Sequence, residues 1–130
     1  MKKRIEVTGA VIVRDDTILA AKRGPQMSLG GFWEFPGGKI EVGETPEQSL
    51  ARELREELNC NITVGDKVTT TEHEYDFAVI VLTTFYCTLV GDEPSLTEHE
   101  EIRWVNRSEM KELTWAPADI PAVDIIMSES

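Results

Sequence analysis

The sequence is poor in cysteine and in positive charge. Its two cysteines, Cys60 and Cys87, lie far apart and form no CxxC pair, so we expect two buried free thiols. Lysine and arginine number 13 against 24 acidic residues, giving a net charge of -11. This charge argues against non-specific binding to a nucleic-acid polymer, which needs a basic surface. It leaves room for a small phosphorylated ligand, because bound divalent metal can supply positive charge.

Long apolar runs are also missing. The longest apolar stretch, 77–90, contains three threonines and a tyrosine, and it is too short and too polar to span a bilayer. After Lys2, Lys3 and Arg4 the chain is interrupted by polar residues and glycine, unlike a secretion signal. We therefore expect a soluble, cytoplasmic protein without membrane contact. A length of 130 residues with 41% hydrophobic residues suits a single domain over 1–130.

The chain alternates strand and helix patterns. Odd positions from Ile5 to Val13 are apolar or glycine, which indicates a strand, and Asp15-Asp16 marks a turn into a returning strand. Further expected elements are a loop over 24–31, strands over 62–75, 77–90 and 102–105, and helices over 108–113 and 118–127. The strand over 77–90 should be central, and Pro121 should interrupt the last helix. This order predicts an α/β layered domain with a mixed sheet.

The clearest helix begins after Thr45. Thr45 is a good N-cap, Pro46 fits the first helical position, and Gln48 completes a capping box. A core-facing stripe follows, and Asn59 stands where a left-handed residue should end the helix. The stripe consists of Leu50, Ala51, Leu54 and Leu58.

Three glutamates lie on another face of this helix. Glu53, Glu56 and Glu57 are spaced i, i+3, i+4, so their charges repel by about 0.2–0.5 kcal/mol per pair. Carboxylates grouped in this way are ligands that Mg²⁺ prefers. Taken alone, they are better interpreted as a solvated acidic face; the residues around them favour a metal site.

The surrounding residues resemble the Nudix box. The run has Gly38, five residues, Glu44, seven residues, and then Arg52-Glu53-Leu54-Arg55-Glu56-Glu57-Leu58-Asn59-Cys60, with Asn59 where the family has glycine. The likeness to MutT-type proteins extends over nearly the whole chain, including Trp33 to Glu41. The segment Ala116 to Pro121 is similar to the (d)CTP pyrophosphohydrolase branch.

This resemblance implies the Nudix fold, an α/β/α sandwich with a mixed β-sheet. It also implies a hydrolase that depends on Mg²⁺, with Mn²⁺ as a substitute, and that acts on phosphorus-containing acid anhydrides. The implied reaction converts a (d)NTP to a (d)NMP and pyrophosphate by water attack at the β-phosphorus. The implied substrate is 8-oxo-dGTP or another modified nucleotide, or (d)CTP, in nucleotide-pool sanitisation.

The resemblance also assigns roles to residues. Glu53, Glu56 and Glu57 become metal ligands, with Glu53 also a candidate base, and the carbonyl of Gly38 (or Gly37) joins them. Glu98, from a later loop, is the expected further carboxylate for metal binding and catalysis. Glu100 and Glu101 compete with it, and His99 is expected at the surface. Arg52 and Glu44 should hold the loop on the helix rather than take part in the chemistry.

Three residues are candidates for substrate binding. Arg23 matches a substrate-contacting arginine of MutT, although a surface arginine is about as plausible. Phe35 could pack against a base or belong to the core. Asp119 takes the place of a specificity asparagine. When ionised it only accepts hydrogen bonds, which suits the cytosine amine or guanine N–H groups. When protonated it also donates, so oxidised guanine remains open as a substrate. Its alternative role is to cap the last helix.

Other functions remain open at this stage. The chain could hydrolyse ADP-ribose or another nucleoside diphosphate derivative, or it could be a non-catalytic Nudix module that only binds nucleotide. An acidic domain without a site is the third possibility. The intact box carboxylates favour the enzyme. We expect a nucleoside triphosphate as the partner, and a monomer or a homodimer.

Overall fold

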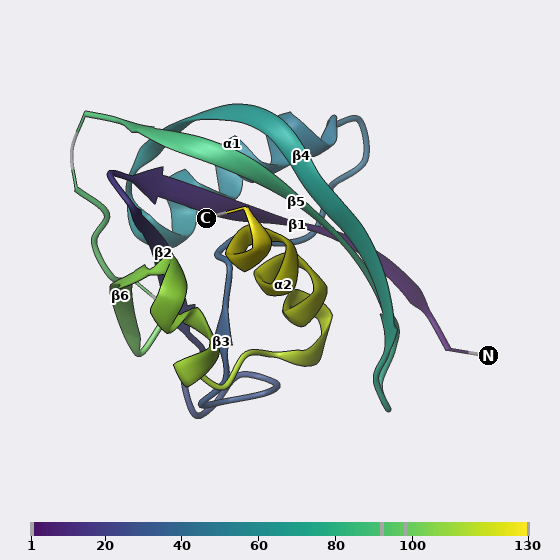
Figure 1. Cartoon of the computed structure of the whole chain (residues 1–130). Helices are drawn as coiled ribbons and strands as arrows, with labels where there is room; N and C mark the ends of the chain where they lie inside the picture. Colours follow the sequence, from purple (N-terminus) through teal and green to yellow (C-terminus); the bar gives the residue numbers. More distant parts are fainter. Residues whose placement is uncertain (1, 92, 98, 130) are drawn as a thin grey trace.

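The computed structural model describes residues 2–91, 93–97 and 99–129. It contains a six-stranded mixed sheet in the order β3-β2-β1-β5-β4, with β6 paired to β2 (Figure 1). In the part of the chain described, no helix is both long and apolar enough to cross a membrane. The elements are β1 (Arg4–Arg14), β2 (Thr17–Lys22), β3 (Trp33–Glu34), α1 (Pro46–Leu58), β4 (Asn61–Glu74), β5 (Val79–Val90), β6 (Glu101–Asn106), the 3-10 turns η1 (Arg107–Glu112) and η2 (Pro117–Asp119), and α2 (Ile120–Ser128).

The sheet is mixed because one of its strand pairs is parallel. β1 runs parallel to β5 from Arg4↔Val79 to Ile12↔Cys87, whereas β1–β2, β2–β3, β2–β6 and β4–β5 are antiparallel. β5 lies between β1 and β4, so the expectation that this strand is internal is confirmed. Its neighbours on both sides explain why its sequence is largely apolar on both faces.

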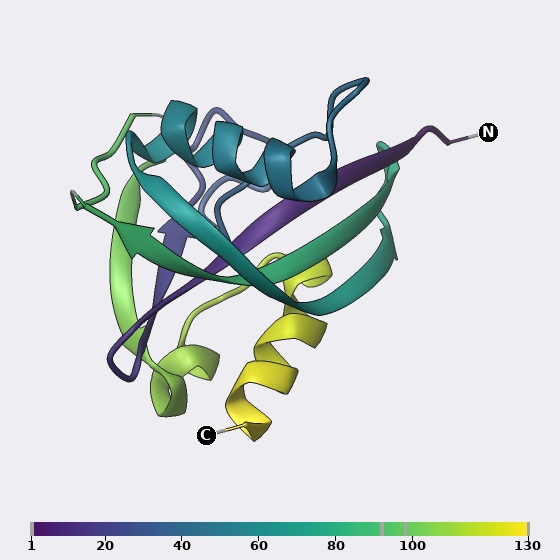
Figure 2. The same cartoon turned by 90° about the horizontal axis from the view of Figure 1, so that it is seen from above.

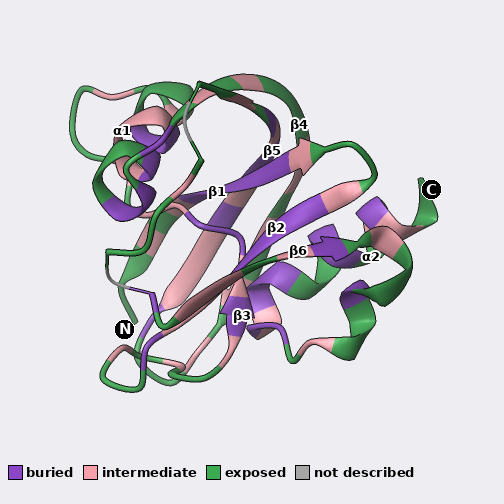
Figure 3. Ribbon diagram, turned by 90° about the vertical axis from the view of Figure 1, so that its left-hand side faces the viewer, coloured by how far each residue is buried: buried purple, intermediate pink, exposed green. Residues whose placement is uncertain are grey.

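The two helices cover opposite faces of the sheet (Figure 2). Strand side chains alternate between the faces, so Ala10 and Ile12 pack with the leucine stripe of α1 while Val11 belongs to the cluster under α2. The buried residues follow the inner strands and the inner sides of both helices (Figure 3). The sandwich predicted from the sequence is therefore confirmed. On the α1 side the helix contributes Leu50, Leu54 and Leu58, and on the other side α2 contributes Ala122, Val123 and Ile126.

The caps of α1 form as expected. The Thr45 hydroxyl accepts from the Gln48 N–H at 3.1 Å, and the Gln48 side chain accepts from the Thr45 N–H at 3.0 Å. Asn59 ends the helix in the left-handed conformation, with φ 50° and ψ 40°. These caps fix both ends of the helix that carries the three glutamates.

Two details differ from the sequence-based expectation. Pro121 does not interrupt the last helix but lies in its first turn, where a missing N–H is tolerated. The segment expected as a helix over 108–113 is a 3-10 turn over 107–112. The structure confirms Cys60 and Cys87 as buried free thiols, and burial raises the pKa of Cys87 to about 12.

The left-handed Asn59 gives a stability prediction. We expect Asn59→Ala to lower the free energy of unfolding by about 1 kcal/mol, because alanine tolerates this backbone conformation poorly. Asn59→Gly should keep the wild-type value or exceed it. Urea unfolding gives the free energy of unfolding of the wild type, Asn59→Ala and Asn59→Gly. Asn61→Ala, at the exposed start of β4, is the control. Equal loss in the alanine and glycine variants would contradict the role of the backbone.

Candidate active site

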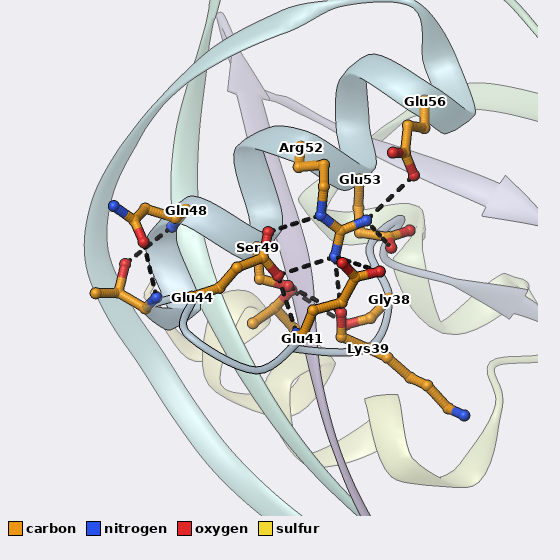
Figure 4. Close-up of polar contacts among 11 residues, drawn as sticks. Gly38, Lys39, Glu41, Glu44, Gln48, Ser49, Arg52, Glu53 and Glu56 are labelled. Atoms are coloured by element: carbon orange, nitrogen blue, oxygen red, sulfur yellow. Dashed lines mark hydrogen bonds and ion pairs between the residues drawn. The ribbon is translucent and has the colours of Figure 1, made fainter.

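Arg52 is the centre of an ion-pair network that joins the loop before α1 to the helix (Figure 4). Its guanidinium bonds both Glu44 oxygens, at 2.7 and 3.0 Å, and the Lys39 carbonyl at 3.0 Å. Its Nη1 also donates to Glu53 at 2.8 Å and to Glu56 at 3.1 Å. The hydrogen bond from Arg52 lowers the pKa of Glu44, so that carboxylate stays ionised. The structure thus brings together the Arg52–Glu44 pair that the sequence predicts.

The glutamates of α1 differ in exposure. The Glu53 side chain is 16% exposed and that of Glu56 is 61% exposed, while Glu57 is largely buried. Thr97, from the segment between β5 and β6, donates through its hydroxyl to the backbone carbonyls of Glu56 and Glu57. The predicted carboxylate Glu98 lies outside the described residues.

The Gly37-Gly38 segment is wedged between β1 and the acidic face of α1. The Gly38 carbonyl accepts from the Thr8 backbone N–H at 2.9 Å, which ties the segment to β1. A Cβ at Gly37 would overlap the Thr8 carbonyl, and a Cβ at Gly38 would overlap the Glu53 carboxylate. Gly37 therefore requires glycine for close approach to the Thr8 backbone and not for an unusual φ, whereas a side chain at Gly38 would displace the Glu53 carboxylate.

A cavity of about 250 Å³ lies next to the Gly37-Gly38 segment. Gly37 and Gly38 form part of its wall, and Phe35 lies at its inner side, 3% exposed and in ring contact with Trp115. Phe35 is thus both a core residue and a cavity residue. Tyr75 and Phe77 stack in parallel at 5.2 Å along another wall. The remaining lining comes from residues 5, 7–8, 23, 28–29, 34, 39, 80, 82, 116 and 118–119.

Asp119 is buried in this cavity and does not cap α2. Its Oδ1 accepts from the Phe35 N–H at 3.1 Å, and its side chain makes no capping bond to the helix. Burial raises the pKa of Asp119 well above its ordinary value, and the nearby Glu34 carboxylate raises it further. The Phe35 N–H and the Arg23 charge oppose this shift without cancelling it. Burial thus extends the pH range over which Asp119 is protonated, and the protonated form can donate a hydrogen bond as well as accept one.

Arg23 also reaches the cavity, held by a neighbour that the sequence analysis missed. Its Nη1 bonds Glu34 Oε1 at 2.7 Å, and its Nε and Nη2 bond Ser28. Glu34 Oε2 bonds the ring of His99 at 2.7 Å. The expectation that His99 lies at the surface is wrong, because its side chain is 0% exposed. Glu34 could have been noticed as a lone acid between the buried aromatics Trp33 and Phe35.

Tyr75 was missed as well. Its hydroxyl accepts from the Ala118 N–H at 2.9 Å and ties the β4–β5 hairpin to η2 beside Asp119. The sequence placed Tyr75 only at the end of a strand, and nothing there indicates its distant partner.

Comparison with known proteins agrees with this architecture. A family model described as the NUDIX domain matches residues 7–124. The chain belongs to the Nudix family. A CTP pyrophosphohydrolase of Escherichia coli is 39% identical, covering 97% of this chain and 93% of its own. A putative 8-oxo-dGTP diphosphatase of Mycobacterium tuberculosis is 41% identical, covering 92% and 84%. A solution structure of a MutT protein from methicillin-resistant Staphylococcus aureus is 56% identical over 100% of both chains, with a TM-score of 0.82.

Nudix hydrolases act on nucleotide substrates and generally use divalent metal. Within residues 2–91, 93–97 and 99–129, no three acidic, histidine or cysteine side chains form a group ready to hold a metal ion. The donor chemistry nevertheless fits one. Glu53 and Glu56 converge on a single cationic nitrogen of Arg52, and hard carboxylate oxygens are the ligands that divalent cations prefer.

The buried Asp119 predicts a pH-dependent stability. A pKa raised on folding gives stability that is complete below the ordinary value of 3.8 and is lost as pH rises through the folded value. Asp119→Asn has no charge to bury and keeps the acceptor for Phe35. We therefore expect its free energy of unfolding, relative to wild type, to increase from pH 4 to pH 8. Urea unfolding at both pH values measures this difference.

The control for the loss of one negative charge is Asp124→Asn, at an exposed position of α2, the helix that follows Asp119. A difference between Asp119→Asn and wild type that stays constant from pH 4 to pH 8 would contradict the raised pKa.

Proposed function

We propose that residues 1–130 act as one Nudix hydrolase domain, a Mg²⁺-dependent pyrophosphohydrolase working in the cytoplasm. It converts a nucleoside triphosphate to the monophosphate and pyrophosphate. The preferred substrate is an oxidised guanine nucleotide such as 8-oxo-dGTP, with (d)CTP as the second candidate.

The shared wall between the cavity and the acidic helix face carries this proposal. Gly37 and Gly38 line the cavity, and Gly38 also packs directly on the Glu53 carboxylate. A base enclosed beside Phe35 and Asp119 therefore leaves its phosphates close to the glutamates of α1. A site that separates base recognition from charge neutralisation in this way suits phosphoanhydride hydrolysis.

In this proposal Glu56, Glu57 and Glu98 hold the metal together with a glycine carbonyl, and Glu53, which the resemblance also gives as a ligand, is assigned as the base. Because the Gly38 carbonyl already accepts from Thr8, the carbonyl of Gly37 is the better candidate of the two. Bound Mg²⁺ neutralises the phosphate charge and aligns the group for displacement. The Arg52–Glu56 contact, at an exposed carboxylate, is the one most easily exchanged.

Glu53 is the proposed base. It is held between Arg52 and Gly38 and is mostly shielded from solvent, so its orientation is fixed. A carboxylate fixed in this way can orient water and accept its proton. Arg23 supplies positive charge at the cavity, where it can contact the substrate.

Asp119 supports the choice of substrate. Its raised pKa extends the pH range over which it is protonated, and in that form its hydroxyl donates while its other oxygen accepts from Phe35. An oxidised guanine presents both donors and acceptors along one edge, so a group that both donates and accepts suits it. The likeness to the Escherichia coli CTP pyrophosphohydrolase supports (d)CTP as the alternative.

A panel of nucleotides tests the function directly. We expect Mg²⁺-dependent pyrophosphate release to be fastest with 8-oxo-dGTP among 8-oxo-dGTP, dGTP, dCTP, CTP, 5-methyl-dCTP and ADP-ribose. In water labelled at oxygen, the labelled oxygen should enter pyrophosphate, because water attacks the β-phosphorus. Turnover of ADP-ribose alone, or label in the monophosphate, would overturn the proposal, and silence with every nucleotide would favour a binding module.

Substitution of the proposed base separates its role from metal binding. We expect Glu53→Gln to lower turnover about 10²–10⁴-fold, as loss of a general base does, while metal affinity measured by calorimetry stays near wild type. Glu98→Gln tests the competing carboxylate by the same two measurements. Glu47→Gln, exposed in the first turn of α1, is the matched control. Lost metal binding in Glu53→Gln would mark Glu53 as a ligand instead of the base.

A further inference from the structure

A row of three polar side chains runs from the segment before β6 to the cavity. We call His99, Glu34 and Arg23 the polar row. His99 Nε2 lies 2.7 Å from Glu34 Oε2, and Glu34 Oε1 lies 2.7 Å from Arg23 Nη1. The three members come from different parts of the chain. Arg23 follows β2, Glu34 belongs to β3, and His99 precedes β6. Glu34 thus accepts from a neighbour on each side.

Exposure increases along the polar row toward the cavity. The side chains of His99, Glu34 and Arg23 are 0%, 14% and 19% exposed. His99 Nδ1 is buried, and among the described residues it has no hydrogen-bond partner. An incompletely satisfied buried polar side chain destabilises a fold compared with an apolar one. Stability alone therefore does not explain a histidine at this position.

The outer end of the polar row shapes the cavity wall. Besides bonding Glu34, Arg23 donates to the carbonyl and hydroxyl of Ser28, and its backbone closes the loop through bonds with Gly31 and Phe32. Arg23, Ser28 and Leu29 all line the cavity. Among the described residues, three of the five guanidinium donors are bonded, so two remain for a ligand.

We propose that His99 is a positioning residue which, through Glu34, fixes Arg23 and the 24–31 loop for binding the phosphorylated substrate. The proposal takes the nucleoside triphosphate from the proposed function. Glu34 links His99 and Arg23 because each of its two carboxylate oxygens bonds one of them. Without the His99 bond, Glu34 is free to turn, and the guanidinium loses the fixed partner that aims its remaining donors at the cavity.

A double-mutant cycle tests the coupling. The variants are His99→Leu, Arg23→Met and the double variant, measured by steady-state kinetics on the best triphosphate. We expect His99→Leu to raise KM about tenfold, the effect of one lost charge-assisted hydrogen bond, with kcat within about twofold of wild type. In the Arg23→Met background, His99→Leu should have no further effect on KM.

A conservative variant and a control distinguish positioning from general damage. His99→Gln keeps a donor near the place of Nε2, so it should restore most of the wild-type KM. Lys22→Gln removes a neighbouring positive charge that pairs with exposed Glu100 at 3.5 Å, outside the polar row, and should leave KM unchanged. If His99→Leu does not fold, Glu34→Gln replaces it in the same cycle with the same expectation.

Three outcomes would overturn the inference. One is additive KM effects of His99→Leu and Arg23→Met. The second is a loss of kcat and metal affinity with KM unchanged, since His99 would then position the segment before β6 and not Arg23. The third is a His99→Gln variant as impaired as His99→Leu. Calorimetric binding of the nucleoside monophosphate product provides the same comparison without turnover, so failure of the proposed activity is separable from failure of the polar row.

Discussion

The close approach of two glycines to their neighbours is the constraint on which the site depends. At Gly37 the backbone lies against the Thr8 carbonyl of β1, and at Gly38 it lies against the Glu53 carboxylate of α1. A side chain at Gly37 would push the loop away from the strand, and one at Gly38 would displace the Glu53 carboxylate. The contact between the cavity wall and the acidic face of α1 therefore depends on two absent Cβ atoms.

The second constraint is electrostatic. Several carboxylates gather around Arg52, which bonds Glu44 through two nitrogens while also reaching Glu53 and Glu56. Glu44 belongs to the loop and is held in place, whereas Glu56 is exposed and shares a nitrogen with Glu53. One guanidinium thus serves two purposes. It fastens the loop to the helix, and it offsets repulsion among glutamates whose grouping disfavours the isolated helix.

Much of this arrangement follows from local sequence. The capping box, the leucine stripe and Asn59 define α1 because helix ends and faces depend on residues a few positions apart. The pairing of Glu44 with Arg52 comes from the resemblance to the Nudix box and not from the local pattern. Long-range contacts leave no such local pattern. Asp119 meets the Phe35 backbone 84 residues away, and His99 is buried although it lies in a short polar segment where charged neighbours suggest exposure.

The unpredicted residues Glu34, Tyr75 and His99 are polar and partly or fully shielded from solvent, and the first two line the cavity. Glu34 raises the pKa of Asp119, while Arg23 lowers it, so the pair that borders the cavity also shifts the pKa of the residue proposed to contact the base. An apolar wall would stabilise the fold without buried polar groups that each need a hydrogen-bond or ion-pair partner. A polar wall instead offers fixed donors and acceptors where a base must be distinguished from its analogues. The polar side chains that interrupt hydrophobic packing thus lie beside the cavity, where the proposed function needs base recognition. The rest of the core consists of apolar side chains that alternate along the strands.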